Sequence, residues 1–204
     1  MRFYLARDSD YDVVAFSATA DQIAGPECYG LPLVPFETVQ EHYPPDVFRM
    51  FIAVGYVRLN AVRARFFAEA KAKGYRLITY LSSKATHWGD TVLGENCFIF
   101  EDNTIQPFVT IGDNTILWSG NHIGHHSTIG AHCFISSHVV VSGHCRIGAS
   151  TFVGVNATIS DSVTVGDRNL IGACALLQKN TRPDETYLAA RTKPFGRSSA
   201  KFFK

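Results

Sequence analysis

The sequence from Thr110 to Gly148 reads TIGDNTILWSGNHIGHHSTIGAHCFISSHVVVSGHCRIG and has a branched aliphatic residue at every sixth position. The spacing continues in both directions, from Leu93 to Leu177, without an exception. A period of six matches neither the 3.6-residue repeat of a helix nor the alternation of a strand. Such strict self-similarity indicates a repeat architecture of stacked short units. The fifteen aliphatic residues are Leu93, Ile99, Ile105, Ile111, Leu117, Ile123, Ile129, Ile135, Val141, Ile147, Val153, Ile159, Val165, Ile171 and Leu177.

Two further positions of each unit are restricted. The residue four places after the aliphatic is small or medium-sized, as in Cys97, Val109 and Cys133, and the residue directly after it is often glycine, as in Gly124. A glycine there suits a turn in which close approach excludes a larger side chain. The pattern predicts a β-solenoid in which each unit is a short strand plus a turn. Three units close a triangular coil of roughly eighteen residues, so about five coils are expected.

Composition and charge are those of an ordinary globular protein. The 204 residues are 46% hydrophobic with a net charge of +1, which argues against nucleic acid as the main partner. No apolar run is long enough to cross a membrane, and no signal peptide is recognised. Cys97, Cys133 and Cys145 occupy small inward positions without any Cys-x-x-Cys pair, which favours buried structural thiols over a zinc ribbon. Reduced thiols predict a cytoplasmic protein.

Residues 1–85 lack the six-residue repeat, and their pattern predicts a small α/β domain. Strands are expected at Tyr11–Ser17, Phe51–Gly55 and Tyr75–Leu81. An amphipathic helix is expected over Val57–Lys73, closed by Gly74, and a short helix over Pro35–His42.

The chain is therefore divided into three parts. Residues 1–85 form the α/β domain, residues 86–178 form the solenoid, and residues 179–204 form an irregular tail. The tail is basic, with seven Lys or Arg against Asp184 and Glu185.

Four segments carry a resemblance to a known family: Asn121–Gly130 (NHIGHHSTIG), Ile135–Gly143 (ISSHVVVSG), Phe152–Asp161 (FVGVNATISD) and Ile171–Leu177 (IGACALL). Together with the order of α/β domain and solenoid, they resemble the hexapeptide-repeat sugar acetyltransferases of the NeuD and PglD type. The resemblance implies a left-handed parallel β-helix after a truncated Rossmann-like domain, and a homotrimer. It implies acetyl transfer from acetyl-coenzyme A to an amino or hydroxyl group of a sugar. The acceptor expected is a nucleotide-linked amino-deoxysugar for surface polysaccharide synthesis.

Six of the eight histidines lie between His122 and His144. The resemblance assigns the general base to His125, and imidazole suits that role because it titrates near neutral pH. A backbone N–H can stabilise the thioester oxyanion, so direct attack without an acyl-enzyme is expected, and no metal is expected. His126 and His144 share one position of the repeat and should stack on adjacent coils. Because no acidic residue flanks His125, the group that orients it is a carboxylate from elsewhere in the chain, or His126, or a backbone carbonyl.

Further site residues follow from the same resemblance. Acceptor contacts are expected from Asn121, His122 and His126. Acetyl-coenzyme A would lie in a groove between two subunits of the trimer, along Gly143, Val155, Ala173 and Lys179.

The N-terminus departs from this family. Related chains begin with a strand and a glycine-rich turn that meets nucleotide phosphates. Here Met1–Asp8 looks like the helix after that turn, and Ser17–Ala20 replaces acidic residues that can hold the base or ribose. Either the true start lies upstream or the usual nucleotide site is lost. Nitrogen and oxygen both remain open as the acceptor atom.

Two other classes remain as alternatives. The first is a non-catalytic or decayed trimeric solenoid scaffold. The second is a zinc-dependent enzyme like γ-carbonic anhydrase, in which three histidines from two subunits hold the metal.

Overall fold

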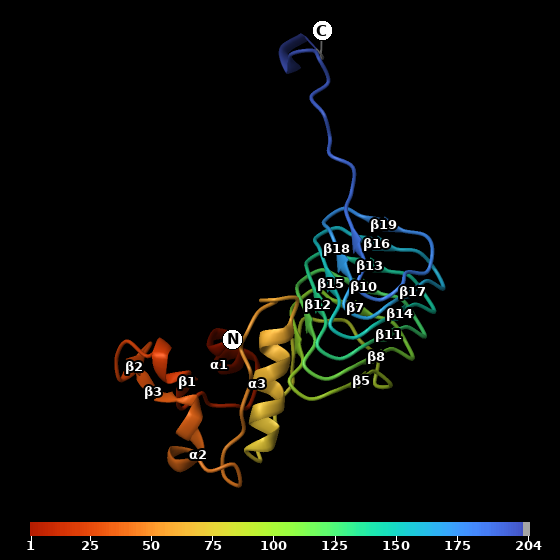
Figure 1. Cartoon of the computed structure of the whole chain (residues 1–204). Helices are drawn as coiled ribbons and strands as arrows, with labels where there is room; N and C mark the ends of the chain where they lie inside the picture. The colour runs from red at the N-terminus through yellow and green to blue at the C-terminus, as the bar shows by residue number, and fades with distance from the viewer. Residues whose placement is uncertain (202–204) are drawn as a thin grey trace.

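The computed structural model describes residues 1–201, and residues 202–204 of the predicted tail lie outside the described part. A small N-terminal α/β part sits beside a left-handed parallel β-helix, and the C-terminal tail leads away from the end of the helix (Figure 1). This arrangement confirms the predicted fold class. Among the described residues, no helix is long and apolar enough to span a membrane.

The solenoid has three parallel faces made of two-residue strands. The first face contains β4 (Tyr80–Leu81), β6 (Phe98–Ile99), β9 (Ile116–Leu117), β12 (Phe134–Ile135), β15 (Phe152–Val153), β18 (Leu170–Ile171) and β20 (Thr186–Tyr187). The second face contains β7 (Thr104–Ile105), β10 (His122–Ile123), β13 (Val140–Val141), β16 (Thr158–Ile159) and β19 (Leu176–Leu177). The third face contains β5 (Val92–Leu93), β8 (Thr110–Ile111), β11 (Thr128–Ile129), β14 (Arg146–Ile147) and β17 (Thr164–Val165).

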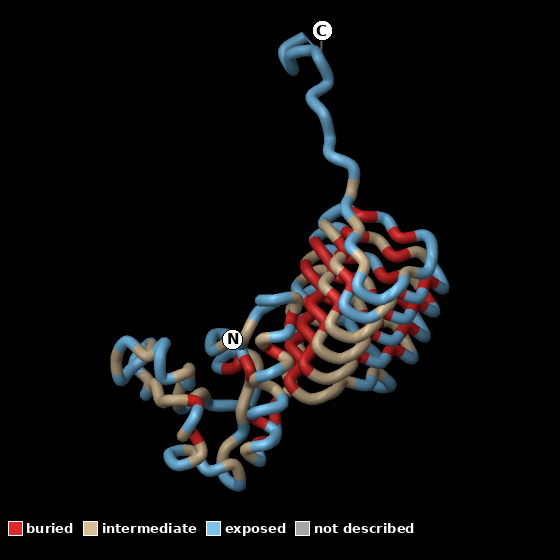
Figure 2. Tube along the Cα trace, in the orientation of Figure 1, coloured by how far each residue is buried: buried red, intermediate tan, exposed pale blue. Residues whose placement is uncertain are grey.

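The aliphatic repeat forms the core, as the sequence predicts. Each aliphatic residue pairs with the equivalent residue of the next coil, as Ile123 does with Val141. From Ile99 onward every member of the series is buried, and the small residues between them are buried too. Figure 2 shows these buried positions as bands that run from coil to coil. No unit could bury its apolar side chain alone, so stacking is what stabilises every coil.

Each corner of the triangle contains one left-handed residue. Along the corner between the second and third faces, the 2–3 corner, these are Phe108, His126, His144 and Ser162, with φ between 55° and 64°. None of these four left-handed residues is a glycine. The position where neighbouring coils approach too closely for a side chain is a different one, the residue directly after the aliphatic. A Cβ on Gly124 would lie 2.5 Å from the carbonyl carbon of Ser142 in the next coil.

The N-terminal part contains α1 (Arg2–Asp8), β1 (Phe16–Ala18), a 3-10 turn (Ala20–Gln22), β2 (Glu27–Cys28), β3 (Leu31–Pro35), a 3-10 turn (Phe36–Thr38), α2 (Val39–His42) and α3 (Ala61–Ala72). Strand β3 pairs in parallel with β1 and antiparallel with β2. The short helix predicted at Pro35–His42 is confirmed, whereas the β2–β3 hairpin was not predicted.

Three sequence predictions for this part need correction. The strand expected at Tyr11–Ser17 is reduced to β1, and Phe51–Gly55 forms no strand. The segment Tyr75–Leu81 contributes a single bridge, between Leu77 and Met50, and then strand β4, which pairs with β6 of the solenoid. The solenoid therefore begins before residue 86, because the first face extends back to Tyr80.

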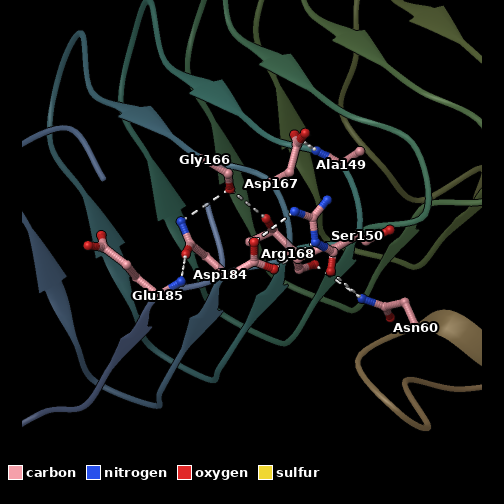
Figure 3. A network of polar contacts seen from close by, with 10 residues as sticks. Asn60, Ala149, Ser150, Gly166, Asp167, Arg168, Asp184 and Glu185 are labelled. Carbon is pink, nitrogen blue, oxygen red and sulfur yellow. Dashed lines mark hydrogen bonds and ion pairs between the residues drawn. The ribbon is translucent and has the colours of Figure 1, made fainter. Parts of the chain in front are cut away.

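The end of the solenoid also differs from the predicted boundary at residue 178. Strand β20 pairs with β18, so residues 179–187 complete the last coil. A bidentate ion pair stabilises this coil: Arg168 Nε lies 2.7 Å from Asp184 Oδ1, and Arg168 Nη2 lies 2.7 Å from Asp184 Oδ2. Figure 3 shows this pair beside Asp167, whose side chain accepts the backbone N–H of Ala149. The irregular tail begins only after Tyr187.

Helix α3 is shorter than the predicted span Val57–Lys73. Arg58, Leu59 and Asn60 all have positive φ, so helical geometry cannot begin before Ala61. Asn60 turns toward the solenoid instead, and its Nδ2 donates to the carbonyl of Ser150 at 3.1 Å (Figure 3).

The helix packs through Phe66, Phe67 and Ala70, but a buried charge, which the amphipathic prediction did not include, attaches it to the solenoid. Arg63 is fully buried and donates to the carbonyls of Gly55, Asn114, His132 and Cys133 at 2.8–3.1 Å. Burial lowers the pKa of this guanidinium to about 10, so it remains a cation at neutral pH. One side chain thus joins two coils to the N-terminal part.

The outer side of the first face is apolar and covered. Phe98, Ile116 and Phe134 point outward there and pack with Leu5 of α1 and with Tyr80. Asp8 at the end of α1 accepts hydrogen bonds from the Ser83 N–H and the Tyr80 hydroxyl, which lower the pKa of its carboxyl to about 2. These contacts hold the N-terminal part against one face and leave the other two uncovered by it.

Replacing Arg63 with alanine should destabilise the fold strongly. The change removes a buried cation that donates to carbonyls of both coils and of Gly55, so we expect a loss of about 2–4 kcal/mol in the free energy of unfolding. The matched control is Arg65→Ala on the exposed side of the same helix, with an expected effect within about 0.5 kcal/mol. Chemical denaturation measures both, and equal stabilities of the two variants would contradict this role of Arg63.

The stability of the fold should also depend on His132. Its ring is half-buried, and Nδ1 accepts from Asn114 Nδ2 at 2.8 Å. Burial, and then the neighbouring Arg63 cation, lower the pKa of His132. The unfolded chain therefore binds this proton more readily, and the free energy of unfolding should fall as pH drops below about 6.5.

The variant His132→Asn keeps a residue that tolerates positive φ but does not titrate. Its unfolding free energy should decrease less steeply than that of the wild type between about pH 7 and pH 5. Denaturation series at several pH values measure both slopes, and identical slopes would show that His132 does not carry this dependence.

Candidate functional site

Three exposed histidines gather on the 2–3 corner of the solenoid. Strand β10 ends at Ile123, Gly124 begins the turn, and His125 and His126 follow it before β11. His144 occupies the same position of the repeat as His126, one coil later. The parallel register therefore brings the three imidazoles together.

The rings contact one another closely. His126 and His144 stack with centroids 4.9 Å apart and planes at 20°, so the predicted stacking of these two residues is found. His125 meets His144 edge to face, also at 4.9 Å. The ring of Phe108 lies on the other side of His126, at 4.6 Å.

His126 supplies the contact that a carboxylate would otherwise make to His125. The Nδ1 atoms of the two rings are 3.1 Å apart, so one donates a hydrogen bond and the other accepts it. When His125 is the donor, its Nδ1 carries the proton and its Nε2 keeps a free lone pair. That tautomer is the one that a general base requires.

The opposite edge of the His125 ring lies over Gly143. A Cβ at Gly143 would be 2.9 Å from His125 Nε2 and 3.1 Å from Asp161 Oδ1. Asp161 occupies the position of Gly143 one coil later, and its other oxygen accepts the hydroxyl of Ser162 at 2.8 Å. The His125 ring and the Asp161 carboxylate therefore both lie over Gly143, and only a residue without a side chain leaves room for them.

Two residues of this neighbourhood were not predicted. Gln106 Oε1 accepts the backbone N–H of His125 at 2.9 Å and so fixes the start of the turn. Asp161 could have been found from the coil period, because it lies two coils after His125. Gln106 could not have been found in this way, because its side chain bonds a residue that does not occupy the equivalent position of the next coil.

The residues predicted to contact the acceptor differ in their exposure. His122 is half-buried on the outer side of the second face, one strand before the base. Asn121 is only 1% exposed, and its side chain bonds the carbonyl of Trp118 and the N–H of Val139 inside the coil. Asn121 is therefore a structural residue, because its amide has no access to an acceptor.

The residues predicted to hold the coenzyme lie on two corners. Gly143 and Lys179 share the 2–3 corner with His125. Val155 and Ala173 lie on the corner between the first and second faces, where both are exposed. One protomer alone does not bring the two pairs together.

A cavity of about 500 Å³ lies in the N-terminal part, away from the histidines. It runs between β1 and the segment 50–54 and is lined largely by apolar side chains such as Phe16, Phe36 and Phe51. Ser17 and Thr19 also reach it. Reactive side chains converge at the 2–3 corner instead, so the corner is the candidate site for chemistry and the cavity a candidate for binding.

The solenoid matches a known repeat family. The family described as bacterial transferase hexapeptide (six repeats) matches residues 90–123, 110–143 and 144–179. No curated protein matches the sequence.

Several solved structures share the fold. The acetyltransferase domain of PglB from Neisseria gonorrhoeae is 24% identical with a TM-score of 0.72, over 81% of this chain and 79% of that one. PerB from Caulobacter crescentus, in complex with CoA and GDP-perosamine, is 23% identical with a TM-score of 0.73, over 80% and 78%. WeeI from Acinetobacter baumannii is 17% identical with a TM-score of 0.65, over 84% and 81%. The likeness confirms the fold, including the order of N-terminal part and solenoid.

Replacing Gly143 with alanine should move the ring of His125 without unfolding the protein. The new methyl group would overlap that ring, which can swing away because it is the exposed end of a side chain. We expect an unchanged melting temperature and altered NMR shifts of the His125 and His126 ring nitrogens. Gly25→Ala is the control, since nothing lies near its Cβ position. Unaltered ring shifts in the Gly143 variant would contradict this packing.

Proposed function

We propose that this chain, whose residues 90–179 are bacterial transferase hexapeptide repeats, is an acetyltransferase that uses acetyl-coenzyme A and a sugar acceptor. The observation that carries the proposal is the arrangement of His125. Its Nδ1 contacts His126, and its Nε2 edge lies over Gly143 near Asp161, on an exposed corner of the solenoid. A ring oriented at one nitrogen and free at the other is suited to accept a proton.

The reaction follows from this geometry. His125 Nε2 takes the proton of the acceptor amine or hydroxyl as that atom attacks the thioester carbonyl carbon. A backbone N–H of the solenoid stabilises the oxyanion of the tetrahedral intermediate. When the intermediate collapses, the C–S bond breaks and the coenzyme thiolate recovers the proton from His125. The acetyl group passes directly to the acceptor, so no acyl-enzyme forms.

A homotrimer would complete the coenzyme site. Val155 and Ala173 lie on a different corner from Gly143 and Lys179, so the groove that contains all four requires two subunits. Lys179 is exposed and supplies a cation for the coenzyme phosphates. The small residues leave backbone amides within reach of the pantetheine arm.

For the acceptor we propose a nucleotide-linked amino-deoxysugar of surface polysaccharide synthesis, as in the complex of PerB with GDP-perosamine. His122 and His126 are the acceptor contacts nearest the base. The cavity beside Ser17 and Thr19 lies away from the histidines of its own protomer, so we propose that it binds the remainder of an acceptor whose reacting end lies at the corner of a neighbouring subunit. The buried thiols of Cys97, Cys133 and Cys145 fit a reducing compartment such as the cytoplasm.

The variant His125→Asn tests the proposal. We expect turnover to fall by about two to four powers of ten, because the proton acceptor is lost. Calorimetry with coenzyme A should show unchanged affinity, since the thioester site remains. His138→Asn is the matched control: it alters an exposed histidine of the neighbouring corner to a residue that tolerates positive φ.

Release of free thiol from acetyl-coenzyme A, measured with a panel of amino sugars and their nucleotide derivatives, gives the rates. Equal turnover of wild type and His125→Asn would refute the assignment of the base. Absence of coenzyme A binding to the wild type would refute the acetyltransferase itself and favour a scaffold.

A further inference from the structure

The histidine cluster has more imidazoles than one base requires. His125 and its partner His126 serve the proposed proton transfer, whereas His144 has no part in it. Yet ring nitrogens of His125, His126 and His144 all lie within 4.8 Å of one another. Within residues 1–201, these three side chains are the one such group of possible metal ligands.

The donor set suits a borderline divalent metal ion. Three neutral imidazoles with an open fourth position are the ligands of zinc in many enzymes, and imidazole also suits copper and nickel. Neither His126 nor His144 forms an ion pair with a carboxylate in the described part of the chain. A cation from solution would therefore compete only with the hydrogen bond between His125 and His126, and not with a carboxylate.

The geometry is close to that of a bound site. Zinc–nitrogen bonds of about 2.0–2.1 Å place tetrahedral ligands roughly 3.3 Å apart. The Nδ1 atoms of His125 and His126 are already separated by 3.1 Å. His144 must approach by rotation of its exposed side chain, whose ring already contacts the other two.

We propose that His125, His126 and His144 form a Zn²⁺ site within a single protomer, and that the bound metal switches off the proposed acetyl transfer. The second part rests on the proposed function. A metal held by Nδ1 of His125 leaves the proton of the neutral ring on Nε2, so that nitrogen can no longer accept one. Zinc and acetyl transfer would then exclude each other at one imidazole.

The test is calorimetric titration of Zn²⁺ into untagged protein, repeated with His144→Asn and with His138→Asn. We expect one zinc per protomer for the wild type and the His138 variant. His144→Asn removes a direct ligand. Loss of a residue that only supports a ligand weakens metal binding roughly 10–100-fold, so we expect this variant to bind zinc at least that much more weakly. Co²⁺ in place of zinc should give the visible absorption of a tetrahedral site, and this absorption should be lost in His144→Asn.

Activity supplies an independent readout. Zinc should inhibit wild-type thiol release, EDTA should restore it, and His144→Asn should keep its basal rate while resisting zinc. Equal zinc affinity of wild type and His144→Asn would overturn the site, whatever the enzymatic result. Zinc binding without inhibition would overturn only the switch. Zinc binding by a protein that transfers no acetyl group would uphold the site and reject the proposed function.

Discussion

The structure depends on the backbone hydrogen bonds that join each coil to the next. Because they run in parallel and in register, every residue lies directly beside the residue one coil later, as His122 lies beside Val140. An inward aliphatic at each unit then produces a continuous apolar column. Any one-residue slip would move that column to the surface, so burial enforces the register along the whole solenoid.

The same register creates the candidate site. Residues that are far apart in sequence become neighbours when they occupy equivalent positions, and thus His126 meets His144 while Gly143 lies between His125 and Asp161. Left-handed corners suit histidine and asparagine better than β-branched residues. Reactive side chains can therefore collect on a corner at little cost to the core.

The N-terminal part is joined to the solenoid by two different devices. Aromatic and aliphatic side chains cover the first face, and Arg63 enters the adjoining corner to bind the carbonyls of Asn114 and His132 in successive coils. A guanidinium with five donors can bind several of these carbonyls at once. This attachment leaves the 2–3 corner and its histidines open to ligands.

By itself, the sequence determined the solenoid, its inward column and the stacking of His126 on His144, because a strict period can be extended through space without knowledge of any contact. It did not determine the N-terminal strands or the true ends of the solenoid. Tyr80 lies one coil before Phe98, but His87 interrupts the aliphatic series before it, and Thr186 joins the first face out of phase with the six-residue spacing. Tertiary structure alone revealed the burial of Arg63 and the contact of His126 with His125. Those depend on which way a side chain turns at a corner, and periodicity says nothing about that.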